Sequence, residues 1–120
     1  MSMQTSSKNK FFQIALPLTL ALSAFSANVL AADVDADAAQ ALAKKSNCFK
    51  CHSVEKKKDG PAYKEVAAKY KGKADAEEKL FKHVTTGPKI KIDGQEETHE
   101  IVKSKNDAEI RNLVRWILSR

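Results

Sequence analysis

The stretch CFKCH at residues 48–52 decides how the rest of the chain is interpreted. It contains both cysteines of the 120-residue sequence, separated by two residues and followed directly by a histidine. This spacing is the attachment signature of a covalently bound haem. The thiols of Cys48 and Cys51 can add to the two vinyl groups on one edge of a porphyrin, which places His52 under the iron. We therefore predict one covalent haem c, with His52 as an axial ligand of the iron.

Two other kinds of site use cysteines at this spacing. A thioredoxin-like redox pair requires a βαβ pattern, and no such pattern is visible in this sequence. A structural zinc site requires four ligands, of which Cys48, Cys51 and His52 supply three. The haem interpretation needs no further residue and is favoured over both alternatives.

The N-terminus has the pattern of a secretory signal peptide. Lys8 and Lys10 precede a mostly apolar, uncharged run over residues 11–30, which ends in small residues. We expect cleavage after Ala31, with Ala32 as the alternative, so that residues 1–31 are the signal and residues 32–120 the mature domain. This predicts a periplasmic location, where covalent haem attachment takes place in bacteria.

The alternative is an uncleaved membrane anchor, because the apolar run is nearly long enough to span a bilayer. Pro17 interrupts this run and Asn28 lies near its end, which favours cleavage and no stable membrane insertion afterwards. Cleavage also removes Met1 and Met3, the two methionines of the chain. The mature protein then contains no methionine.

The remaining sequence is patterned for helices, and no strand is predicted. A mature chain this short builds a thin core and usually needs a cofactor to help cover its apolar faces. We predict four helices and a polar loop. A short helix lies within the alanine-rich residues 33–47, a second begins at Tyr63 and is ended by Gly72, and a third covers residues 74–86. A loop follows over residues 89–105, and the last helix is capped by Asn106, with Glu109 completing a capping box.

From about residue 36 to residue 120 the chain resembles the small bacterial class I cytochromes c. The similarity rests on CFKCH at 48–52, GPAY at 60–63, VAAKY at 66–70, TG at 86–87 and LVRWIL at 113–118. The resemblance implies an all-α fold whose N- and C-terminal helices cross and whose helices wrap the haem. It also implies that the Pro61 carbonyl accepts a hydrogen bond from His52, which would fix the tautomer of the imidazole.

The sequence departs from this family at the second axial ligand, which is usually a methionine in the loop before the last helix. His99 lies in the corresponding loop and is the preferred replacement, since imidazole is a good ligand for haem iron. His83 falls at the edge of a helix stripe and is expected near a haem propionate or at the surface. A lysine, or an open or water-filled sixth site, is the remaining alternative.

These residues predict an electron carrier and no enzyme. Two histidine ligands would make a closed, low-spin haem with a lower reduction potential than methionine ligation gives. An open or displaceable sixth site would instead make a ligand-binding or sensor protein. A peroxidase assisted by His99 and Glu100, and a colourless thiol–disulfide protein, are less favoured.

Charge indicates the class of partner. The formal net charge is +6, and lysines crowd the sequence around the attachment motif. They could steer docking onto acidic surfaces of other redox proteins, such as multihaem cytochromes. Nucleic acid is not expected as a partner, because the lysines are interspersed with acids, and the protein is expected to be a monomer. The lysines concerned are Lys44, Lys45, Lys50, Lys56, Lys57 and Lys58.

Overall fold

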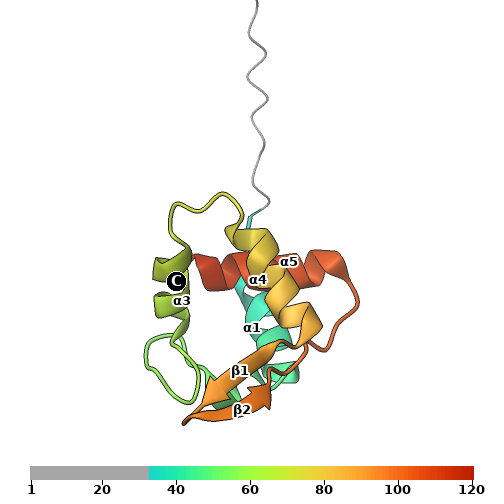
Figure 1. The fold of residues 1–120 in the computed structure, drawn as a ribbon. Coiled ribbons are helices and arrows are strands. Elements are labelled where there is room, and N and C mark those ends of the chain that lie inside the picture. The colour runs from blue at the N-terminus through green and yellow to red at the C-terminus, as the bar shows by residue number, and fades with distance from the viewer. Residues whose placement is uncertain (1–32) are drawn as a thin grey trace, which may run out of the picture. The chain divides into compact units, whose positions relative to one another are not determined.

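Helices build most of the part of the chain that the computed structural model describes, which is residues 33–120 (Figure 1). The predicted signal segment and its cleavage site lie outside these residues. Within them, no helix has the length and apolar character needed to cross a bilayer. The elements in order are α1 (Ala36–Lys45), α2 (Cys48–Cys51), α3 (Tyr63–Tyr70), α4 (Ala76–Thr86), β1 (Lys89–Ile92), β2 (Gln95–Thr98) and α5 (Asp107–Leu118).

The first and last long helices cross, as predicted (Figure 1). Ala39 and Ala43 of α1 are fully buried, and their short side chains let the two helix backbones approach closely. The side-chain amide of Asn112 adds a double hydrogen bond, accepting from the Asp35 backbone N–H at 2.9 Å and donating to the Asp35 carbonyl at 2.8 Å. The buried stripe of α5 consists of Ile110, Leu113, Val114, Trp116 and Ile117.

The start of α5 is capped by Asn106, as predicted. Its side-chain oxygen accepts from the backbone N–H groups of Ala108 and Glu109, which satisfies two of the unpaired donors at a helix N-terminus. The predicted reciprocal bond from Glu109 is not formed. Instead, the Asn106 N–H donates to the Ser104 hydroxyl, which in turn donates to the Glu109 carboxylate.

A β-hairpin occupies the segment that sequence patterning predicted as a polar loop. β1 and β2 pair antiparallel, with Ile92 opposite Gln95. Asp93 and Gly94 both have positive φ, at 49° and 81°, as a type I′ turn requires. The expectation of no strand was therefore wrong. The strands are only four residues long and β2 is exposed along its whole length, so apolar alternation was weak and the Asp-Gly pair was the main signal.

An ion-pair network joins α4 to α5. Glu77 accepts from Arg115 at 3.0 Å and from Arg111 at 3.2 Å, and Arg111 also donates to Glu78. Hydrogen bonding to Arg115 is the main cause of a lowered pKa of Glu77. The Arg111 guanidinium also lies over the Phe81 ring, 4.5 Å from its centroid. The network fixes the α4 helix on α5.

We predict that Glu77→Gln lowers the free energy of unfolding at pH 7 by about 0.5–1 kcal/mol, as for a partly exposed ion-pair network. Because the carboxylate has a lowered pKa in the folded state, it stabilises the protein above the pKa of the unfolded chain. This stabilisation is lost as the pH falls through the folded-state value. Urea denaturation at pH 7 and in acid should therefore show a difference between wild type and variant that shrinks with acidity.

Glu78→Gln is the matched control, since its side chain is 70% exposed and meets one arginine, whereas that of Glu77 is 33% exposed and meets two. Its effect should be smaller at both pH values. If both substitutions lowered the free energy of unfolding equally at pH 7, the stronger role assigned to Glu77 in the network would be contradicted.

Candidate functional site

The single turn α2 brings both cysteines onto one side of the chain. Cys48 and Cys51 are three residues apart in this turn, so their side chains lie on the same helix face. Both are free, half-buried thiols. The preceding Asn47 adopts a left-handed backbone conformation with φ of 60°, which lets the chain reverse between α1 and α2. The arrangement suits attachment of both thiols to one edge of a flat group.

His52 follows α2 directly, and its ring is held by the turn at residues 60–61. Its Nδ1 lies 2.7 Å from the Pro61 carbonyl oxygen, so an imidazole protonated at Nδ1 donates this bond. The ring also stacks on Tyr63, with 5.3 Å between centroids and 22° between planes. The Nε2 lone pair of His52 is left for a metal, which is the usual arrangement of a metal-binding histidine.

Gly60 is required by this close packing. A Cβ at this position would lie 2.5 Å from Cε1 and 2.8 Å from Nδ1 of His52. The Gly60 N–H also donates to the Cys51 carbonyl at 2.8 Å, which ties the turn to the attachment motif. The sequence singled out Gly60 only as part of the GPAY stretch at 60–63. The contact with His52 depends on how the chain folds back, which the local pattern does not show.

His99 lies across from His52, immediately after β2. The ring centroids of His52 and His99 are 6.1 Å apart, with 47° between the planes. Its Nδ1 lies 2.7 Å from the Glu100 carbonyl oxygen, so its Nε2 is also available. Two imidazoles bound on opposite sides of one metal, each at about 2 Å, would have centroids about 6 Å apart. The two rings thus have the separation that a shared metal ion requires.

His83 is the third histidine at this site. Its ring meets the His99 ring edge-on, with centroids 4.5 Å apart and planes at 67°. Burial is the main cause of a lowered pKa of His83, and the neighbouring His99 adds to it. The sequence predicted His83 at the edge of the apolar stripe of its helix, and its side chain is half-buried in the structure. Its contact with His99 was not predicted.

Burial shifts the pKa of two predicted haem-binding groups, His52 and Cys48. It lowers the pKa of His52, and the hydrogen bond to Pro61 opposes the shift only in part. Burial therefore favours the neutral form of His52, which is the form that binds metals. Burial also raises the pKa of the Cys48 thiol, whereas reactive redox cysteines have lowered values. Among residues 33–120, no group of three or more histidine, cysteine or acidic side chains is placed to hold a metal ion by itself.

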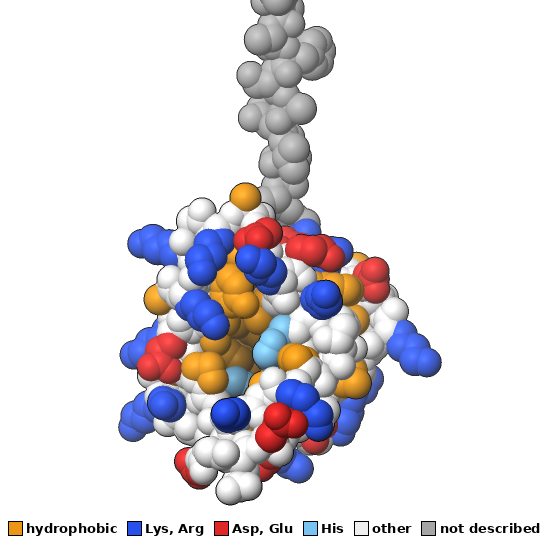
Figure 2. Space-filling view, viewed as in Figure 1, with side chains coloured by type: hydrophobic (Ala, Val, Ile, Leu, Met, Phe, Trp, Pro, Cys, Tyr) orange, Lys and Arg blue, Asp and Glu red, His pale blue; other side chains and the backbone are white. Residues whose placement is uncertain are grey.

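The surroundings fit a large, flat, apolar group. Figure 2 shows a hollow lined by hydrophobic side chains, with histidine side chains at its wall and lysines and arginines around it. Trp116 is 1% exposed, and its indole N–H has no hydrogen-bond partner among the described residues. Buried N–H groups are rarely unpaired, and a haem carries carboxylates that can accept. Half-buried apolar side chains against the core include Phe49, Val54, Val66, Tyr70 and Phe81.

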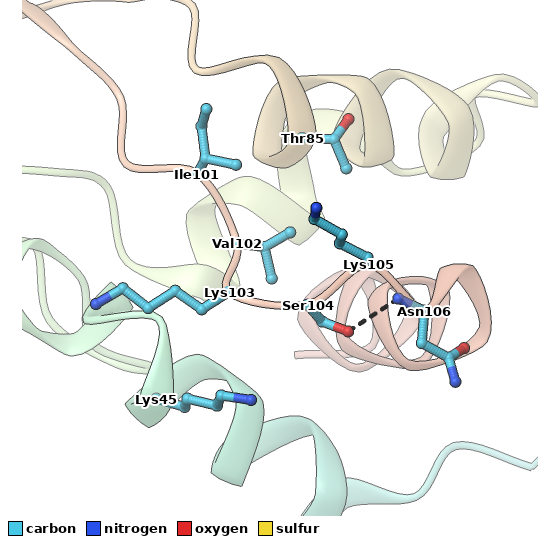
Figure 3. Close-up of a pocket in the computed structure, with 8 residues that line it drawn as sticks. All are labelled: Lys45, Thr85, Ile101, Val102, Lys103, Ser104, Lys105 and Asn106. Atoms are coloured by element: carbon cyan, nitrogen blue, oxygen red, sulfur yellow. Dashed lines mark hydrogen bonds between the residues drawn. The ribbon is translucent and has the colours of Figure 1, made fainter.

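A second recess lies elsewhere, between the end of α1, the end of α4 and the segment before α5 (Figure 3). It measures about 690 Å³ and contains none of the cysteines or histidines. Its lysines, Lys45, Lys103 and Lys105, point in different directions (Figure 3). The recess therefore plays no part in the predicted site, and no set of donors converges in it.

Comparison with known proteins agrees with this geometry. Residues 36–120 match the family Cytochrome c. The chain is 41% identical to cytochrome c-551 of Allochromatium vinosum, covering 79% of this chain and 97% of that protein. It is 40% identical to cytochrome c-552 of Nitrosomonas europaea, covering 82% and 93%. Among solved structures, the class 1 cytochrome MtoD of Sideroxydans lithotrophicus is 60% identical, with a TM-score of 0.70 and coverage of 72% of this chain and 97% of that one.

We predict that Gly60→Ala reduces haem content and destabilises the protein. The added Cβ must displace the His52 ring or the turn that holds it, and overpacking of this kind costs about 1–3 kcal/mol. The ratio of haem absorbance to protein absorbance and a denaturant titration would measure the two effects.

Gly72→Ala is the matched control, because Gly72 has a positive φ of 75° but open space around its Cβ position. Its cost should be about 1 kcal/mol of backbone strain, with an unchanged haem spectrum. A Gly60→Ala protein with normal haem content and stability would contradict the steric argument.

Proposed function

We propose, on the premise that this chain belongs to the cytochrome c family, that it is an exported electron carrier with two histidine ligands. Members of this family carry one covalently attached haem c and pass electrons, and they are not enzymes. The chain shares that cofactor and that role. The finer proposal concerns its ligands, reduction potential and location: the haem is held by Cys48 and Cys51, and its iron by His52 and His99.

The observation that carries this proposal is the facing pair of imidazoles. The ring centroids of His52 and His99 are 6.1 Å apart. The Nδ1 atom of each ring is hydrogen-bonded to a backbone carbonyl oxygen. Each Nε2 is therefore free, and each ring is oriented before any metal binds. No methionine occurs after Met3, so a thioether ligand would have to come from the segment that we predict is cleaved.

The haem supplies an iron centre that gains and loses one electron. His52 and His99 would both bind the iron, and a centre whose ligands do not exchange suits electron transfer. Methionine ligation raises the reduction potential of a haem. A second histidine in its place is expected to lower the potential relative to methionine-ligated members of the family.

The location follows from the N-terminal sequence. The family match begins at residue 36, which leaves the preceding segment for the predicted signal peptide. We propose export to the periplasm and cleavage after Ala31 or Ala32. The mature domain would then work as a shuttle between other redox proteins.

The charge around the site supports docking onto acidic partners. Lys58 and Lys69 lie near enough to the site to lower the pKa of His52 and His83, respectively, although each is a minor cause. Figure 2 shows further basic side chains around the hollow. A positive rim would attract anionic surfaces and speed their encounter with the haem edge.

We predict that wild-type protein has a low-spin spectrum without the near-infrared methionine–iron band, and that His99→Met gains that band. His99→Ala should become high-spin and bind carbon monoxide when reduced, because it lacks the second ligand. Optical spectra of the oxidised and reduced proteins, with and without carbon monoxide, test this. The intact mass of the same samples should equal the chain from Ala32 or Asp33 plus one haem.

A high-spin wild type that binds carbon monoxide at once would overturn the proposal in favour of an open sixth site and a ligand-binding function. A low-spin His99→Ala would show that another residue holds the iron.

We also predict opposite salt dependences for two small oxidants. Oxidation of the reduced protein by anionic ferricyanide should slow as ionic strength rises from about 0.01 to 0.1 M, where the Debye length falls from about 30 to 10 Å. Oxidation by cationic hexaamminecobalt should accelerate over the same range. Stopped-flow absorbance gives both rates, and rates that do not change with salt would argue against a positive docking surface.

A further inference from the structure

We propose that His83 is a positioning residue for His99, whose ring it holds in the orientation that faces His52. This inference rests on the proposed function, because it treats His99 as the second axial ligand. His83 does not bind the iron in this scheme. It acts through the ring of its neighbour.

The backbone at His99 is fixed by the end of α4. The His99 N–H donates to the Pro88 carbonyl at 2.9 Å, and the Val102 N–H donates to the Val84 carbonyl at 2.9 Å. At Gly87 a Cβ would lie 2.9 Å from the His99 carbonyl oxygen, so α4 and this segment are in close contact. These contacts place the Cα of His99 but leave the side chain free to rotate.

The ring of His99 then has two restraints. One is its Nδ1 bond to the Glu100 carbonyl at 2.7 Å. The other is the edge-on contact with His83 at 4.5 Å between centroids. His83 and Gly87 are four residues apart in α4 and its C-cap, so they share one face of the helix. The same face therefore contacts both the backbone and the ring of His99.

His52 is held in an equivalent way on the other side. Its Nδ1 bonds the Pro61 carbonyl, and its ring stacks on Tyr63. Each proposed ligand thus has one carbonyl that fixes its tautomer and one aromatic neighbour that fixes its plane. His83 has this second role for His99. The angle between the two imidazole planes, 47° in this structure, is the quantity that His83 should control.

The test uses the purified holoprotein and three variants. His83→Ala removes the neighbouring ring, His83→Phe keeps a flat aromatic edge without ring nitrogens, and Lys82→Ala changes the exposed adjacent residue as the control. The readouts are the g-values of the ferric low-spin electron paramagnetic resonance signal, which report the angle between axial ligand planes, and the rate at which added cyanide displaces the sixth ligand.

We expect His83→Ala to shift and broaden the low-spin signal and to accelerate cyanide binding about ten-fold, as for loss of a group that orients a metal ligand. His83→Phe and Lys82→Ala should both resemble wild type. If His83→Ala does not fold, His83→Leu, which has similar volume but no planar ring, carries the same expectation as the alanine variant.

Two results would overturn the positioning role alone. The first is a wild-type signal and cyanide rate in His83→Ala, when His99→Ala has lost its low-spin signal. The second is His83→Phe behaving like His83→Ala, which would mean that ring packing is not what matters. A low-spin His99→Ala together with a high-spin His83→Ala would instead make His83 the ligand, and the proposed function would fail in its ligand assignment as well.

Discussion

The hydrogen bond between His52 and the Pro61 carbonyl sets the geometry on which the rest of the site depends. It occupies Nδ1 of the imidazole, which leaves Nε2 for a metal. The hydrogen bond forms because Gly60 has no Cβ and lets the chain pass directly against the ring. The Gly60 N–H also donates to the Cys51 carbonyl, which holds the turn in place. Stacking on Tyr63 then fixes the ring plane. One short loop therefore orients the ligand, and the adjacent α2 turn presents both cysteines beside it.

The opposite side of the site, which carries His99, is positioned by the β-hairpin. The hairpin leaves α4 at Pro88 and returns at His99, where the His99 N–H closes the loop on the Pro88 carbonyl at 2.9 Å. This closure places His99 relative to α4, largely independently of the exposed residues at the hairpin tip. A type I′ turn at Asp93 and Gly94 gives the return its register. The hairpin thus sets the position of His99 relative to α4, the helix that carries His83.

Helix α5 connects the two sides. It packs against α1, α3 and α4. Trp116 meets Tyr63 edge-on at 5.6 Å, which links α5 to the His52 side. Arg111 and Arg115 bind Glu77, which links α5 to the helix that carries His83. The distance between the two histidines is therefore determined by packing on a shared helix, together with the hydrogen bond from the Lys103 N–H to the Ser46 hydroxyl ahead of the attachment motif.

The sequence by itself determined the chemistry and most of the helices. A CFKCH stretch, helical spacing and capping residues are local patterns, and each depends on neighbours within a few positions. The absence of methionine after Met3 also followed from the residue inventory. Only the tertiary structure decided the contact of His83 with His99, the facing of His99 and His52, and the need for glycine at position 60. The hairpin was missed because its strands are short and largely exposed. These features arise where segments distant in the chain meet, and local periodicity in the sequence does not predict such contacts.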